Sequence, residues 1–154
     1  MKQIILAFFG SIFPAILFNI DRKKLVWAGL SGALGWSMYL VGQALGGGIV
    51  MNTFLGAFSV GIYSEIMARI KKAPSMQFSI PGIFPLVPGI MAYTTVKYVV
   101  DGFFDKAFVH GTQSIIVAGA IAFGIMLAST TYRFFNKAHR DMNSLKNKRK
   151  RNPN

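Results

Sequence analysis

The positions of charged side chains divide this chain into long apolar stretches. Four stretches contain no Asp, Glu, Lys or Arg, and they cover residues 3–20, 25–64, 73–96 and 111–132. A transmembrane helix needs about 20 mostly apolar residues. Three of the stretches fit one helix each, and the second fits two, separated by the turn signal Gly46-Gly47-Gly48. The pattern predicts five spans, at about 3–20, 25–45, 49–70, 78–100 and 112–135.

Helices are the expected form of these spans, because backbone polar groups in lipid must be satisfied within the protein. A transmembrane barrel would show segments of about ten residues with alternating polarity, and the chain has none. The predicted fold class is an all-α integral membrane protein with five transmembrane helices, the fourth interrupted by a Pro/Gly motif. We divide the chain into a transmembrane domain, 1–136, and a basic cytoplasmic tail, 137–154. The first span lacks a signal-peptide cleavage site, so we expect it to stay in the mature protein.

Composition supports a membrane protein. Apolar residues make up 53% of the chain and charged residues 14%, whereas soluble domains carry about 25% charged residues. There is no cysteine, which excludes disulfides and thiolate metal sites. The two histidines, His110 and His139, have no second ligand at metal-binding spacing. Neither a catalytic motif nor a cofactor or metal site is expected, so the sequence does not favour an enzyme.

The basic residues predict an orientation. With five spans, 14 of the 17 Lys and Arg residues fall on one side of the membrane. The positive side of a membrane protein is normally cytoplasmic, which places the N-terminus outside and the C-terminus inside. The same rule explains the basic run 146–151 as a topology anchor near anionic lipid, and no nucleic acid partner is expected.

The fourth span carries the most informative motif. Three of the six prolines fall within it, at Pro81, Pro85 and Pro88. Each interior proline costs a helix about 3 kcal/mol relative to alanine, so a break with carbonyls turned inward is expected. Such a break either lines a binding site, as in transporters, or only kinks the bundle, and both interpretations stay open. The candidate substrate-binding residues are Pro81, Gly82, Pro85, Pro88, Gly89, Tyr93, Thr94 and Asn52.

Glu65 is the only carboxylate inside a predicted span. An acid within the membrane is a functional candidate, here for coupling transport to an ion. However, Arg69 follows four residues later on the same helix face, near the predicted cytoplasmic end. The spacing therefore favours an ion pair between Glu65 and Arg69, with a coupling role as the alternative.

The run Pro81-Gly82-Ile83-Phe84-Pro85-Leu86-Val87-Pro88-Gly89-Ile90-Met91-Ala92-Tyr93 resembles the Pro-Gly signature of the threonine/serine exporter family. The chain is similar to the small membrane subunit of the split, two-subunit form. This resemblance implies a larger membrane subunit as partner and a place in the bacterial inner membrane. It also implies export of threonine and serine, or of a dicarboxylate such as succinate, driven by the proton-motive force. A homo-oligomer, or a scaffold subunit that does not itself transport, stays open.

Overall fold

The computed structural model describes residues 2–151, and describes side chains for residues 2–137. Every regular element in this part of the chain is helical, in agreement with the predicted all-α class. The elements are α1 (Lys2–Leu17), α2 (Arg22–Ala44), α3 (Ile49–Ile70), α4 (Met76–Ile83), the 3₁₀ turn η1 (Phe84–Leu86), α5 (Gly89–Val100) and α6 (Phe104–Arg151).

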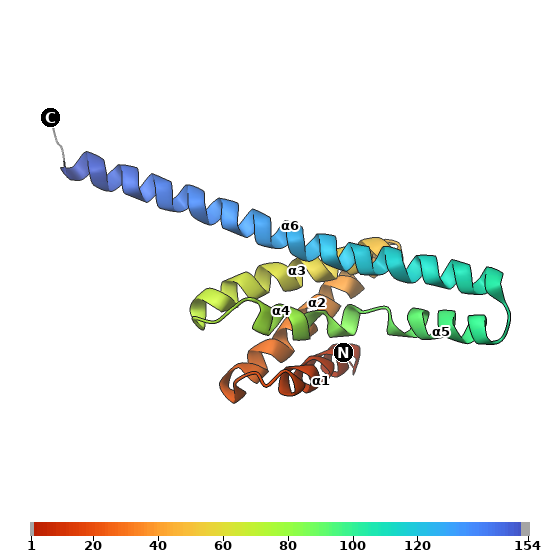
Figure 1. The fold of residues 1–154 in the computed structure, drawn as a ribbon. Helices are drawn as coiled ribbons and strands as arrows, with labels where there is room; N and C mark the ends of the chain where they lie inside the picture. The colour runs from red at the N-terminus through yellow and green to blue at the C-terminus, as the bar shows by residue number, and fades with distance from the viewer. Residues whose placement is uncertain (1, 152–154) are drawn as a thin grey trace.

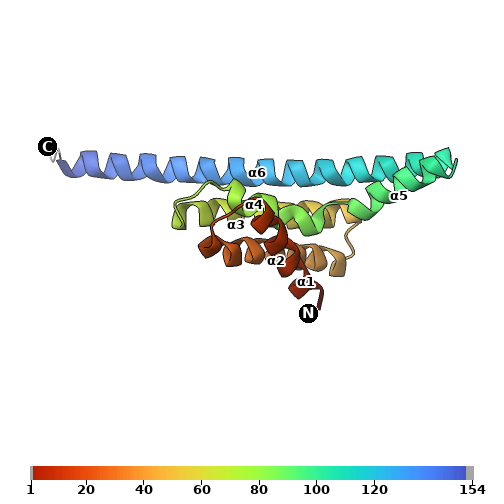
Figure 2. The same ribbon diagram turned by 60° about the horizontal axis from the view of Figure 1, so that its bottom comes forward.

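The long helix α6 runs along one side of a small bundle, and α1 lies on the opposite side (Figures 1 and 2). Between them, α2 packs on both α1 and α3, while α4 is set among α1, α2 and α3. The principal packing partner of α5 is α6. Figure 1 shows these two helices as a hairpin that extends beyond the bundle, while the C-terminal part of α6 extends beyond it in the other direction.

Within residues 2–151, three helices have the length and composition of membrane spans, and a bent pair of helices is a fourth candidate. The three helices are α2, α3 and the part of α6 from Phe104 to Lys137. The fourth candidate consists of α4 with η1 and α5, which are bent by 54° at the break, as in a broken span or a re-entrant loop. The predicted interruption of this segment is confirmed. The prediction of five spans is not confirmed, because α1 has only 16 residues and ends at Leu17 rather than near residue 20.

Similar backbone turns end four of the helices. Residues Asn19, Gly46, Lys72 and Gly102 have positive φ angles. After each, the next amide bonds back to the carbonyl five residues earlier, as Phe103 N does to Tyr98 O at 2.9 Å. This pairing is the Schellman motif, which satisfies carbonyls that the helix end would otherwise leave free. The motif at Gly46 confirms the turn predicted between the second and third spans.

The predicted start of the fifth span, near residue 112, is wrong. Gly102 turns the chain within three residues, and α6 begins at Phe104 instead of near residue 112. The charged residues between the fourth and fifth predicted spans are compatible with the start of a helix. Asp105 lies in the first turn of α6, where its negative charge complements the helix dipole. At its other end α6 continues without a break into the predicted basic tail, 137–154, of which residues 152–154 lie outside the described residues.

Small residues allow α3 and α6 to pack closely. A Cβ atom at Gly124 would lie 3.0 Å from the Phe54 carbonyl oxygen and 3.1 Å from Ala57 Cβ. One turn further, a Cβ atom at Gly61 would lie 2.5 Å from Ala128 Cβ. Close approach at small residues is how helices associate in lipid. Beside this contact, Ala57, Val60, Leu86 and Ile121 form the buried core.

The basic ends of the helices gather at one end of the bundle. Lys24 Nζ, at the start of α2, donates to Gln77 Oε1 of α4 at 3.2 Å. Lys71, at the end of α3, lies 4.3 Å above the Trp27 ring, and the Arg69 guanidinium lies 5.0 Å from the Tyr132 ring of α6. Basic residues beside Trp and Tyr are typical of the membrane–water boundary.

The α3–α6 contact can be tested with two glycines of α6. We expect Gly124→Val to destabilise the fold by about 1–3 kcal/mol, since the new side chain must fit against Phe54 and Ala57. Gly119→Val is the matched control, because a Cβ there meets nothing within 4 Å. Thermal unfolding of both variants in detergent measures the difference. Equal melting temperatures would contradict the packing role of Gly124.

Candidate functional site

The fourth span breaks where its prolines cluster. The helix α4 tightens into the 3₁₀ turn η1, and Val87 is extended, with φ −62° and ψ 131°. Pro88 then has φ −76° and ψ 54°, and Gly89 N donates to Val87 O at 2.8 Å across it. These values describe an inverse γ-turn centred on Pro88. The chain leaves this turn as a new helix, α5.

The break satisfies part of the backbone that the prolines disrupt. In a continuous helix, Pro85 and Pro88 would deprive the carbonyls of Pro81 and Phe84 of their amide partners. Instead, Phe84 N bonds to Pro81 O, and Val87 N bonds to Phe84 O at 3.3 Å. Both bonds span three residues, which explains the 3₁₀ form. The carbonyls of Pro81 and Phe84, which a continuous helix would leave without a donor, therefore accept hydrogen bonds within the break.

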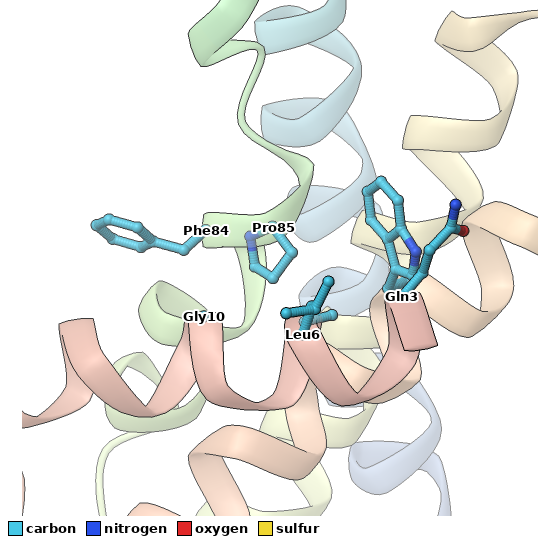
Figure 3. A pocket seen from close by; sticks show the side chains of 7 residues that line it. Gln3, Leu6, Gly10, Phe84 and Pro85 are labelled. Carbon is cyan, nitrogen blue, oxygen red and sulfur yellow. The ribbon is translucent and has the colours of Figure 1, made fainter. Parts of the chain in front are cut away.

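Two hollows adjoin the break. One, of about 300 Å³, lies between α1, α2 and η1. Figure 3 shows Gln3, Leu6 and Gly10 along α1 on its floor, with Pro85 facing Leu6 and Phe84 turned away. The other, of about 230 Å³, follows the chain from Pro85 to Met91. Its far side is formed by α2, α3 and α6, through Trp36, Tyr39, Ile49, Thr53 and Val117.

The structure brings three of the eight predicted binding residues together. Pro85, Pro88 and Gly89 line the hollow of about 230 Å³. Pro81 and Gly82 precede them but are buried in the bundle instead. A Cβ atom at Gly82 would collide with the Ser31 hydroxyl and lie 2.9 Å from Val60 Cγ1. The Pro-Gly run thus divides into a packed part, 81–82, and a part, 85–89, in which Pro85, Pro88 and Gly89 face the hollow while Leu86 is buried in the core.

The other three predicted residues lie away from both hollows. Asn52 is 3% exposed, and its Nδ2 donates to Gly47 O at 3.0 Å, at the turn between α2 and α3. Tyr93 is 71% exposed on α5. The hydroxyl of Thr94 donates to the Ile90 carbonyl of its own helix at 2.7 Å. Their assignment to a binding site stays a prediction.

Glu65 does not pair with Arg69 as the spacing suggested. Glu65 as a residue is 9% exposed, and its buried Oε1 has no hydrogen-bond partner among the described residues. The Arg69 guanidinium is directed to the Tyr132 ring on α6 instead. The ion pair was inferred from one helix alone, whereas α6 offers Arg69 an aromatic face. Glu65 is thereby left as a buried acid on α3 without its expected counter-ion.

Sequence reasoning missed the aromatic residues of the site. Trp36 and Tyr39 stack with ring centroids 4.9 Å apart and an interplanar angle of 13°. Both border the hollow of about 230 Å³, and Trp36 borders the larger one as well. Their i, i+3 spacing beside Gly35 was the available signal, because aromatic residues one turn apart share a helix face. Within the residues whose side chains are described, no three His, Asp or Glu gather as a metal site requires.

The division of the Pro-Gly run predicts different effects for its two glycines. We expect Gly82→Ala to lower the melting temperature, since Ser31 and Val60 occupy the space that the methyl group needs. Gly89→Ala should leave stability nearly unchanged, because a Cβ there meets nothing within 4 Å. Unfolding of both variants in detergent measures this. A destabilised Gly89→Ala protein with an intact Gly82→Ala protein would contradict the assignment.

Comparison with protein families identifies the family of this chain. The model of the family described as "Threonine/Serine exporter, ThrE" covers residues 3–131, which include α2, α3, the whole of the break and most of the apolar part of α6. The family is one of transporters, in agreement with the expectation that the chain is not an enzyme. No solved structure matches the chain.

Proposed function

We propose that this chain, which belongs to the threonine/serine exporter family, is one subunit of a secondary exporter in the bacterial inner membrane. Its partner is a larger membrane subunit, and its substrate is threonine, serine or a dicarboxylate such as succinate. The observation that carries the proposal is the break at residues 84–88 beside a hollow of about 230 Å³. Non-helical backbone at membrane depth occurs where it is buried in protein or lines a cavity.

The chemistry of the break suits a carboxylate. The helix α5 begins at Gly89, beside the hollow, and its N-terminus has no side-chain cap. The first amides of a helix point out of its N-terminus and favour anions. Since nothing would contact a Cβ at Gly89, a ligand can approach the backbone there. Threonine, serine and succinate all carry a carboxylate, so this chemistry does not choose among them.

A partner subunit would cover the exposed part of the molecule. None of the α5 residues is buried, and α5 carries exposed apolar side chains such as Ile90 and Val96. In a bilayer such a face meets either lipid or another apolar helix. A scaffold subunit that does not itself transport would bind its partner through the same face of α5. This alternative differs only in that the break would have no role in transport.

Glu65 is the proposed coupling group. Glu65 is buried within the candidate span α3, and its Oε1 has no hydrogen-bond partner among the described residues. Proton-driven transporters use such intramembrane acids as relays. This role replaces the ion pair with Arg69 as the interpretation that the packing of α3 and α6 favours.

Efflux measurements test the transport role. Cells that express this chain with its larger partner should export labelled serine, threonine or succinate, whereas either subunit alone should not. Pro88→Ala should reduce export about tenfold or more, since it removes the residue that fixes the break. Pro74→Ala, a proline outside the break, is the matched control. If Pro88→Ala assembles and exports normally, the scaffold alternative is favoured.

The coupling role makes a separate prediction. We expect Glu65→Gln to reduce export driven by a proton gradient about tenfold or more, while exchange of labelled for unlabelled substrate continues. Asp101→Asn, at an exposed acid that ends α5, should change neither. The two activities are compared in vesicles containing both subunits. Normal gradient-driven export by Glu65→Gln would remove Glu65 from the coupling mechanism.

The orientation is also a proposal, supported by the basic residues at one end of the bundle. We expect the N-terminus and the turn at Gly102 to lie outside and the C-terminus to lie in the cytoplasm. Reporter fusions at the three positions measure this. If the turn and the C-terminus report the same side, the orientation is wrong, and an N-terminus inside would mean that α1 does not cross the membrane.

A further inference from the structure

Trp36 lies where the two hollows meet. The hollow of about 300 Å³ and the hollow of about 230 Å³ have only two lining residues in common, Trp36 and Pro85. Pro85 belongs to η1, where its ring restricts the backbone. Trp36 belongs to α2, whose backbone is held against α3, because a Cβ at Gly35 would lie 2.5 Å from Val60 Cγ2. The two hollows are thus bordered in common by the rigid ring of Pro85 and by the side chain of Trp36, whose helix is fixed against α3.

The indole of Trp36 has an unused hydrogen-bond donor. Its Nε1 is buried, with no acceptor among the described residues. An indole N–H normally finds a partner when it is buried, and leaving it without one costs free energy. The ring is held here by stacking on Tyr39, one turn further along α2. Because both hollows adjoin Trp36, its ring has open space beside it in which to turn.

We propose that Trp36 recognises the carboxylate of the transported solute and, by turning, joins the two hollows into one path. This inference rests on the proposed export function and adds the residue that selects the solute. In the arrangement described, the ring separates the hollows and its N–H has no partner. A solute carboxylate that reaches either hollow offers the acceptor that the N–H lacks, so binding favours the turned ring. A solute without a carboxylate offers no charged acceptor and is bound less well.

The first experiment uses substitutions at Trp36 in vesicles that contain both subunits. Trp36→Phe keeps an aromatic ring for Tyr39 and removes the N–H together with the five-membered ring that carries it. It should raise the half-saturating concentration for serine and threonine about tenfold, with a smaller effect on the maximal rate, since hydrogen bonds to charged groups are the strong ones. Trp36→Ala removes the barrier and should increase the leak of labelled serine when no proton gradient is applied. Trp27→Phe is the matched control and should change neither quantity.

The second experiment follows the ring itself. Trp27 and Trp36 are the two tryptophans of the chain, so the Trp27→Phe protein reports Trp36 alone once the tryptophans of the partner are replaced. Serine and threonine should shift the emission of Trp36 with saturation. Threoninol, which has the amine and side chain of threonine but no carboxylate, should not.

The outcomes separate this inference from the export function. Suppose that the wild-type complex exports serine or threonine. If Trp36→Phe then has the same half-saturating concentration as the wild type, or the emission of Trp36 does not change when the solute is added, the role of Trp36 is wrong and the export function stands. Equal responses to threonine and threoninol would overturn carboxylate recognition. If the wild-type complex exports no carboxylate solute, the export function fails and the role of Trp36 fails with it.

Discussion

Inside a bilayer every backbone carbonyl has to find its hydrogen-bond donor within the protein, and the prolines of the fourth span remove donors at three positions. The chain responds by tightening into a 3₁₀ turn, and bonds that span three residues give two of those carbonyls new donors. An inverse γ-turn at Pro88 follows. These short turns place Leu86 in the core with Val60 and Ile121. They also direct α5 away from the bundle and along α6.

The remaining helices fix the chain before the break but not the chain after it. Gly82 fits against Ser31 of α2 and Val60 of α3, so the part before the break is fixed by contacts that a single methyl group would disturb. The helix α3, which contacts Gly82 through Val60, is itself packed closely on α6 at Gly61 and Gly124. After Pro88 the chain has no such support, because α5 contains no buried residue. The site therefore lies at a boundary between a rigid body and a weakly held helix.

Much of this fold follows from the sequence, since long uncharged stretches, clustered prolines and Gly46-Gly47-Gly48 each have a direct physical meaning. The spans of α2 and α3, the turn between them and the break were predictable on these grounds. The start of α6 was not, because Asp101, Asp105 and Lys106 suggest a loop unless one knows that Gly102 alone reverses the chain. The site was predictable only along the Pro-Gly run. Trp36 and Tyr39 come from another helix, and the orientation of Arg69 depends on Tyr132, so both required the tertiary packing.

The continuity of α6 has a mechanical consequence. A helix of 48 residues is about 72 Å long, more than twice the thickness of the apolar core of a bilayer, which is about 30 Å. Its first residues are joined to α5 by the tight turn at Gly102, and its middle is clamped against α3. A rod held at its centre tilts as a lever, so a small displacement of one end produces an opposite displacement of the other. Movement of the C-terminal arm of α6 would in this way be transmitted across the membrane to α5, and through α5 to the γ-turn at Pro88.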